Sequence, residues 1–151
     1  MHTAIRSDKI ILSSERETEK IANKFITKLR PGNIVFLYGE IGVGKTTFIR
    51  YLINKFQITN KLKISEVTSP TFNLLNEYQI NELKINHYDF FRLKSAEELK
   101  NLNLFEDNTN CITLIEWPQM IEKKPKGLIE LNFEYEKDHQ KRSLQIKGLK
   151  L

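Results

Sequence analysis

The sequence contains little cysteine, tryptophan, proline or glycine, and it has no long hydrophobic run. Its 151 residues include one cysteine, one tryptophan, four prolines and six glycines. The single cysteine, Cys111, excludes an intramolecular disulfide framework, so the fold must depend on a buried apolar core. No apolar stretch reaches the roughly 20 residues that a membrane-spanning helix requires. These absences exclude the disulfide-rich secreted class and give no reason to expect a membrane protein.

Length and composition favour a single globular domain. Residues 1–151 are 40% hydrophobic and 28% charged, as is common for a chain that buries one core. The segment Met1–Lys9 carries charges of both signs and contains no apolar signal core. Together with the lone cysteine, this composition favours a reducing compartment, and we expect a cytoplasmic protein.

The formal net charge of +5 could indicate a nucleic-acid partner. The basic clusters are short, however, and comprise Lys123-Lys124-Pro125-Lys126 and Lys141-Arg142. Neither cluster alternates with aromatic residues, as a surface that stacks nucleic-acid bases would. Charge alone therefore gives little support for direct contact with nucleic acid.

Hydrophobic periodicity predicts alternating helix and strand in the first part of the chain. Ser14–Leu29 has apolar residues on one helical face, and Ser14 with Glu17 forms a capping-box pattern, so we expect a helix. Asn33–Tyr38 is a short, continuous apolar run of the kind found in strands buried on both faces of a parallel sheet. A glycine-rich loop follows, and Thr46–Phe56 again has helical spacing.

The rest of the chain predicts further strands and one short helix. Ser95–Leu102 carries a second capping-box pattern and is expected to form a helix. Strands are expected at Thr71–Tyr78, Leu83–Asp89, Cys111–Glu116, Leu128–Tyr135 and Ser143–Leu149. The first two suit a hairpin, and the last two alternate apolar and polar residues and suit an antiparallel pair. We therefore predict an α/β fold with a mixed central sheet, parallel in its middle and antiparallel toward its edges, flanked by helices.

Residues 39–46 carry the pattern Gly-x-x-x-x-Gly-Lys-Thr, which is suited to bind phosphates. Gly39 and Gly44 allow backbone conformations in which successive amide N–H groups point toward phosphate oxygens. Lys45 adds a positive charge for the β- and γ-phosphates, and Thr46 adds a hydroxyl ligand for Mg²⁺ at the positive end of the following helix. The residues expected to bind the nucleotide here are Gly39, Glu40, Ile41, Gly42, Val43, Gly44, Lys45, Thr46 and Thr47.

The sequence context supports this interpretation over a glycine-rich turn that binds nothing. The pattern directly follows a predicted buried strand and directly precedes a predicted amphipathic helix, which is the context that a phosphate-binding loop needs. We therefore predict a P-loop NTPase fold that binds Mg·ATP, with Lys45 among the catalytic residues.

Enzymes with such a loop also need a carboxylate at the end of another core strand, to hold the magnesium shell or orient a water molecule. Glu116 ends the apolar run that begins at Ile112, and it is the stronger candidate. Asp89 ends the preceding predicted strand and is the second candidate. Both are predicted to be catalytic residues and metal ligands, although a carboxylate at a strand end can also be a turn former.

Three further features have both a structural and a functional interpretation. Ser69-Pro70-Thr71 is either a structural turn or a switch loop whose hydroxyl senses the γ-phosphate or Mg²⁺. His87 is expected to be a strand residue with a hydrogen-bonded ring rather than a catalytic base. Trp117, beside Glu116, is either part of the core or a wall of the nucleotide pocket.

Four motifs together resemble the bacterial TsaE (YjeE) family. They are Gly39–Thr47, Ser69-Pro70-Thr71-Phe72, His87-Tyr88-Asp89-Phe90-Phe91-Arg92-Leu93 and Glu116-Trp117-Pro118, in the family's order. The resemblance covers residues 14–118, and Phe91 departs from the family's pattern, in which tyrosine is more common there. The family is a small ATPase needed to make N6-threonylcarbamoyladenosine in tRNAs that read codons beginning with A.

The resemblance implies roles for individual residues and names partners. It implies that Thr46 and Glu116 serve Mg²⁺, with Asp89 in or near the metal's shell, and that Thr18 lies by the nucleotide base. Arg142, on the predicted closing hairpin, is a weaker match and is expected to contact the nucleotide. The partners implied are TsaD, which transfers the threonylcarbamoyl group, and its companion TsaB. Contact with tRNA would be indirect or direct.

A small-molecule kinase and a GTPase are the alternative functions. Such kinases commonly close an arginine-rich lid over the phosphoryl group, but between Gln57 and Asn110 this chain has a single arginine, Arg92. Guanine selectivity generally uses an Asn-Lys-x-Asp loop, and Asn54-Lys55-Phe56-Gln57 and Asn60-Lys61-Leu62-Lys63 both lack the aspartate. We therefore expect an ATPase that is slow alone and depends on a partner, with a small-molecule kinase as the alternative.

Overall fold

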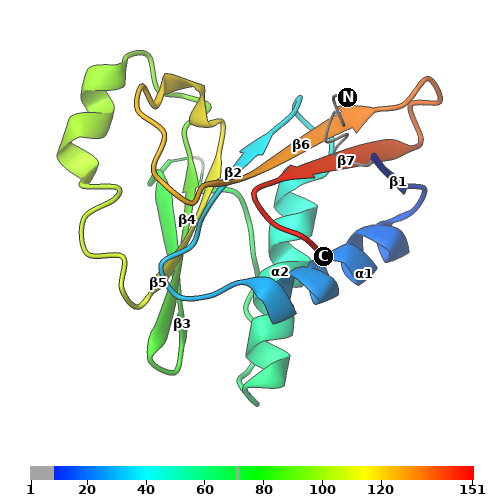
Figure 1. The fold of residues 1–151 in the computed structure, drawn as a ribbon, viewed down its shortest axis with the longest axis horizontal. Coiled ribbons are helices and arrows are strands. Elements are labelled where there is room, and N and C mark those ends of the chain that lie inside the picture. The colour runs from blue at the N-terminus through cyan, green and yellow to red at the C-terminus, as the bar shows by residue number, and fades with distance from the viewer. Residues whose placement is uncertain (1–8, 71) are drawn as a thin grey trace, which may run out of the picture.

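The computed structural model describes residues 9–70 and 72–151, which contain a seven-stranded sheet (Figure 1). In chain order the strands are β1 (Ile10–Leu12), β2 (Ile34–Tyr38), β3 (Leu75–Ile80), β4 (Leu83–Asp89), β5 (Cys111–Glu116), β6 (Ile129–Tyr135) and β7 (Arg142–Lys147). Their order across the sheet is β1-β7-β6-β2-β5-β4-β3. Neighbours among β6, β2, β5 and β4 pair in parallel, whereas β1–β7, β7–β6 and β4–β3 are antiparallel pairs. The predicted α/β fold with a mixed sheet is confirmed.

Helices cover both faces of the sheet. The helical segments are α1 (Glu15–Lys28), α2 (Lys45–Thr59) and the 3-10 helices η1 (Ala96–Leu102) and η2 (Pro118–Met120). Figure 1 shows α1 and α2 together on one side of the sheet and η1, in yellow-green, on the other. The central strands are therefore buried on both faces of the sheet, which explains why β2 and β5 are apolar along most of their length.

The larger core lies between the sheet and the two α-helices. Phe25 of α1 and Phe48 of α2 meet edge to face, with 5.3 Å between ring centroids, and Phe48 also contacts Phe133 of β6 at 5.8 Å. A smaller core on the opposite face contains Phe36 and Tyr88 under the η1 segment.

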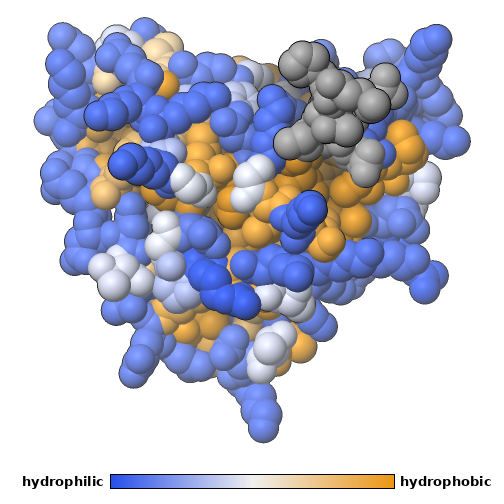
Figure 2. Space-filling model, in the orientation of Figure 1, coloured by the Kyte–Doolittle hydropathy of each residue, from blue (hydrophilic) through white to orange (hydrophobic). Residues whose placement is uncertain are grey.

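In Figure 2 hydrophilic side chains cover most of the visible face, and hydrophobic ones are exposed mainly near its centre. Within the described residues, no helix is long and apolar enough to cross a membrane.

Several element boundaries differ from the sequence prediction. The three-residue strand β1 is too short to give a periodic signal, and it was not predicted. Strand β3 begins at Leu75 because Leu74, with a φ of 64° and an amide that donates to the Pro70 carbonyl, belongs to a turn. The predicted strand start, Thr71, lies outside the described residues. The predicted helix Ser95–Leu102 is a 3-10 helix that begins at Ala96.

The two predicted capping boxes have different outcomes. At η1 the Glu98 carboxylate accepts a hydrogen bond from the Ser95 amide at 3.3 Å, as predicted. At α1, Ser14 occupies the N-cap position but its side chain makes no capping bond, so that prediction is wrong. The Glu17 carboxylate instead accepts a bond from Lys20 at 3.4 Å, and the Ser14 side chain is exposed to water, which can satisfy its hydroxyl.

The Phe25–Phe48 contact predicts a large loss of stability when Phe25 is truncated. Phe25 is fully buried, so Phe25→Ala should lower the free energy of unfolding by about 3–5 kcal/mol through lost burial and a cavity. The exposed Ile58 at the end of α2 offers a control, because Ile58→Ala should change stability by less than about 0.5 kcal/mol. Urea denaturation followed by circular dichroism measures both, and equal effects would contradict this description of the core.

Candidate functional site

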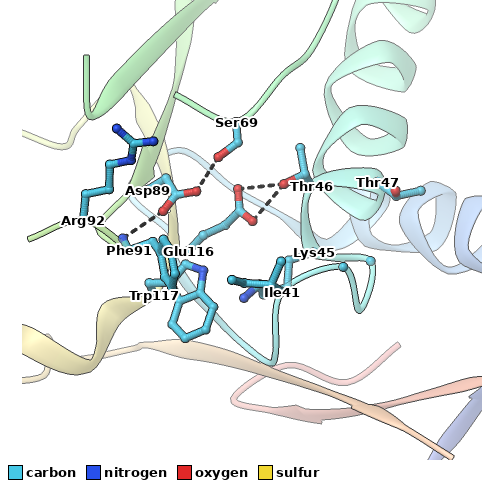
Figure 3. Close-up of a pocket in the computed structure, with 12 residues that line it drawn as sticks. Ile41, Lys45, Thr46, Thr47, Ser69, Asp89, Phe91, Arg92, Glu116 and Trp117 are labelled. Carbon is cyan, nitrogen blue, oxygen red and sulfur yellow. Dashed lines mark hydrogen bonds between the residues drawn. The ribbon is translucent and has the colours of Figure 1, made fainter. Parts of the chain in front are cut away.

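The parallel register of the central strands brings the predicted site residues to one edge of the sheet. Glu116, the last residue of β5, pairs with Leu37 of β2 and with Asp89, the last residue of β4. The glycine-rich loop starts directly after β2 and runs into α2. A pocket of about 320 Å³ opens where these segments meet (Figure 3). Its lining comprises Ile41, Gly42, Gly44, Lys45, Thr46, Thr47, Ser69, Asp89, Phe91, Arg92, Glu116 and Trp117.

The loop needs glycine for two separate reasons. Gly39 has a φ of +147°, and a Cβ atom there would lie 2.8 Å from both the Phe133 carbonyl oxygen and the Val43 side chain. Gly44 has a φ of +117° and forms the N-cap of α2. The first turn of α2 carries no acidic side chain, so the positive end of the helix is left available to an anion. The hydroxyl of Tyr135 holds the loop from β6 by donating to the Ile41 carbonyl at 3.1 Å.

Lys45 is only 4% exposed, and its ammonium group is held by two contacts inside the site. It donates to the Gly39 carbonyl and lies 3.8 Å from the centroid of the Trp117 ring. Burial lowers the pKa of Lys45, while the nearby carboxylates of Glu116 and Asp89 act in the opposite direction. Trp117 itself has a left-handed backbone, with a φ of 57°.

Glu116 is 2% exposed and is surrounded by hydrogen-bond donors. The Thr46 hydroxyl donates to its carboxylate, with 2.9 Å to Oε1 and 3.2 Å to Oε2. The Nε2 atom of His87 lies 2.7 Å from Oε2. The expectation that the ring of His87 is hydrogen-bonded is therefore right for Nε2, but the buried Nδ1 has no hydrogen-bond partner among the described residues, so it is wrong for that atom.

Asp89 connects the end of β4 to the segment predicted to be a switch loop. The Ser69 hydroxyl donates to Oδ2 of Asp89, and the backbone amide of Phe91 donates to Oδ1 at 2.9 Å (Figure 3). Arg92, which also lines the pocket, has its guanidinium 4.8 Å from the centroid of the Phe72 ring, and Phe72 is 85% exposed. Thr71, which completes the predicted switch motif, lies outside the described residues.

A second pocket, of about 230 Å³, lies on the other side of the glycine-rich loop. It is lined by Leu12, Ser14, Glu15, Thr18, Gly42, Val43, Gly44, Thr47, Phe133, Gln140 and Arg142. Thr18, expected to lie by the nucleotide base, and Arg142, expected to contact the nucleotide, are thus brought together from α1 and β7. Gly42, Gly44 and Thr47 line both pockets. Of the predicted nucleotide-binding residues, Gly39 and Glu40 line neither pocket.

The oxygen groups of the larger pocket suit a magnesium ion. Thr46 supplies a hydroxyl, and Asp89 and Glu116 supply carboxylates, all of them oxygen ligands. Mg²⁺ commonly takes few protein ligands and fills its octahedral shell with water and phosphate oxygens, so a small donor set beside a phosphate-binding loop fits it.

Sequence reasoning assigned no site role to three residues. Phe91 and Arg92, quoted there as part of a family motif, line the pocket, and Tyr135 holds the loop. The contact between His87 and Glu116 was also missed, although one signal was present: His87 is two residues before Asp89, which places both on one face of a strand.

Comparison with known proteins identifies relatives across most of the chain. A family model described as threonylcarbamoyl adenosine biosynthesis protein TsaE matches residues 12–144. The tRNA threonylcarbamoyladenosine biosynthesis protein TsaE of Rickettsia bellii is 46% identical over 123 residues, which cover 81% of this chain and 83% of that protein. The protein of the same name from Rickettsia typhi is 40% identical over 137 residues, which cover 90% and 92%. Bacillus subtilis YdiB, a solved structure, shares the fold with a TM-score of 0.67 at 24% identity, over 92% of this chain and 83% of that one.

The position of Lys45 over Trp117 predicts a fluorescence change without any ligand. Because Trp117 is the only tryptophan, Lys45→Met should change its emission spectrum in the ligand-free protein by removing the ammonium group from the ring. The exposed Lys24 provides a control, and Lys24→Met should leave the spectrum unchanged. Identical spectra for wild type and Lys45→Met would show that this contact is absent in solution.

Proposed function

The chain belongs to the family of threonylcarbamoyl adenosine biosynthesis proteins TsaE, and we propose that it serves this pathway as a Mg²⁺-dependent ATPase with a P-loop NTPase fold. As a TsaE protein it takes part in the formation of threonylcarbamoyladenosine in tRNA. One observation supports the ATPase proposal above the others. A glycine-rich loop, a buried lysine, a hydroxyl and two strand-end carboxylates meet around one pocket.

The loop and Lys45 would bind the phosphates. Backbone N–H groups of residues 39–44 and the N-terminus of α2 supply donors and a positive potential. The Lys45 ammonium would exchange the Gly39 carbonyl for oxygens of the β- and γ-phosphates. Thr47, which lines both pockets, would contact the nucleotide between its phosphates and its sugar.

Hydrolysis would depend on the two carboxylates. Thr46, Glu116 and Asp89 would hold Mg²⁺, which when bound neutralises negative charge on the phosphate oxygens. Glu116 would also orient the attacking water and accept its proton, since it is the more deeply buried carboxylate. Asp89 would couple the site to Ser69, whose hydroxyl it already binds.

The smaller pocket would take the base side of the nucleotide. Thr18 offers a hydroxyl and Arg142 a guanidinium group, and this pocket shares the wall of Gly42, Gly44 and Thr47 with the pocket on the phosphate side. Trp117 would form the opposite wall near the phosphates, where its ring contacts Lys45 in the ligand-free protein. In this arrangement one nucleotide would span both sides of the glycine-rich loop.

The partner in this proposal is the TsaB–TsaD complex, bound in the ATP state. The contact between Ser69 and Asp89 lies in the pocket, and Arg92, which also lines the pocket, contacts the exposed ring of Phe72. A change at Asp89 when Mg·ATP binds could therefore be transmitted to a surface that another protein can contact. The chain would act as a nucleotide-dependent switch, and the transfer chemistry would belong to TsaD.

Removing the negative charge of Glu116 should slow hydrolysis while sparing nucleotide binding. Glu116→Gln should retain affinity for a slow ATP analogue in calorimetry but lower kcat by at least about 100-fold, because an amide cannot accept a proton from water. Asp89→Asn should act in the same direction with a smaller effect. The exposed turn residue Glu82 provides a control, since Glu82→Gln should leave kcat unchanged. Unchanged turnover in both site variants would show that these carboxylates do not catalyse.

Docking onto the partner should depend on the nucleotide. A pull-down with purified TsaB–TsaD should recover the chain with ATP or a slow analogue and recover much less of it with ADP. Lys45→Ala should fold normally, lose nucleotide binding and lose docking, whereas the surface variant Lys24→Ala should dock like wild type. Equal recovery in every condition would contradict the switch, and no recovery in any condition would contradict the partner.

A further inference from the structure

His87 is a buried histidine directly behind the proposed catalytic carboxylate. It lies on β4, 0% exposed, and its Nε2 atom is 2.7 Å from Oε2 of Glu116. In the parallel pairing of β4 with β5, Asp89 is opposite Glu116 and His87 is opposite Leu114, so His87 lies one step further from the edge of the sheet. It does not line the pocket that Thr46, Asp89 and Glu116 share.

The surroundings of the ring determine which nitrogen carries the proton. An ionised carboxylate can only accept, so Nε2–H must donate to Glu116. Nδ1 is buried and has no partner among the described residues. A ring with its only proton at Nδ1 would leave that buried donor without an acceptor and would set two acceptors, Nε2 and Oε2, against each other. The contacts therefore select Nε2 as the nitrogen that carries the donated proton.

Glu116 has a second hydrogen-bond partner, Thr46, which a bound ligand would also contact. Thr46 donates to both carboxylate oxygens in the ligand-free protein, but its hydroxyl lines the pocket and is the proposed magnesium ligand. Coordination of Mg²⁺ would use an oxygen lone pair of that hydroxyl and would reorient its O–H, so the direction of its bond to Glu116 would depend on the ligand. The bond from His87 comes from the closed side of the carboxylate, where no substrate can displace it.

We propose that His87 is a positioning residue that holds Glu116 in its catalytic orientation through the Nε2–H···Oε2 bond. This inference rests on the proposed ATPase function, because it assigns a purpose to the orientation of Glu116. His87 touches neither nucleotide nor metal. It fixes one carboxylate oxygen, so that the other faces the pocket for the metal and the attacking water.

Two substitutions at this position separate hydrogen bonding from space filling. His87→Leu fills a buried site but cannot donate, and it should lower kcat for ATP hydrolysis by about 10- to 100-fold with little change in KM. His87→Gln keeps an N–H donor at a similar reach and should recover most of that loss. A purely structural role predicts no such recovery and no separation of kcat from KM.

A matched control comes from the neighbouring strand. Thr113 of β5 is almost as deeply buried and lies on the opposite face of the sheet from Glu116, and its hydroxyl has no hydrogen-bond partner among the described residues. Thr113→Val should therefore leave kcat and KM unchanged. Any change in kcat or KM for Thr113→Val measures how much a core substitution in this sheet disturbs the site when no hydrogen bond to Glu116 is removed.

A measurement on the ligand-free protein tests the pairing independently of turnover. The sequence has three histidines, so nitrogen-15 spectra of the imidazoles can be assigned by comparison with His87→Gln. His87 should carry a proton at Nε2, and Glu116→Gln should shift the Nε2 resonance.

The outcomes distinguish this inference from the proposed function. A ring without a proton at Nε2, or one indifferent to Glu116→Gln, overturns the inference even if the protein hydrolyses ATP. So do equal kcat values for His87→Leu and wild type, or for His87→Leu and His87→Gln. If the spectra show the pairing but wild type does not hydrolyse ATP, the proposed function fails, and the catalytic purpose of the pairing fails with it. Should His87→Leu not fold, His87→Gln and the spectra still decide between a bonded and an unbonded ring.

Discussion

The parallel register of β2, β5 and β4 is the constraint on which the site depends. Because Leu37 and Asp89 both pair with Glu116, the loop after β2 and the two carboxylates emerge at the same edge of the sheet. In parallel sheets this carboxyl edge is where ligands commonly bind. A slip of one residue in β5 would turn Glu116 to the opposite face, among the residues that pack under η1. The apolar side chains that hold this register are therefore as necessary to the site as its polar groups.

The ligand-free site satisfies its buried charges internally. Lys45 and Glu116 are almost fully buried, and an isolated buried charge is costly. Lys45 is compensated by the Gly39 carbonyl and the Trp117 ring, and Glu116 by Thr46 and His87. A nucleotide that enters must exchange some of these contacts for its own. The fold thus accommodates groups that a core selected for stability alone would leave out.

The sequence allowed the central strands and both α-helices to be predicted, because their apolar residues recur with the period of each structure or run without interruption. Glu116 and Asp89 could be identified as strand ends from the same patterns. Strand β1 could not be predicted, since three residues carry no period. The contact between His87 and Glu116 depends on how β4 and β5 are aligned, which no local pattern specifies. That residues 1–151 form a single domain, and that the site residues have the roles given to them, stay predictions.

Trp117 illustrates how two demands on one position can oppose each other. Its backbone is left-handed, a conformation that glycine or asparagine adopts at little cost and that a bulky residue adopts only under strain. Its ring, however, lies over the Lys45 ammonium and packs on Phe91 with 4.8 Å between centroids, contacts that glycine and asparagine would lose. Replacing Trp117 by glycine or asparagine would therefore relieve the backbone strain but remove the aromatic ring that contacts Lys45. We therefore expect this position to change slowly in evolution, because a substitution that relieves the backbone strain loses the ring contacts, and one that keeps an aromatic ring keeps the strain.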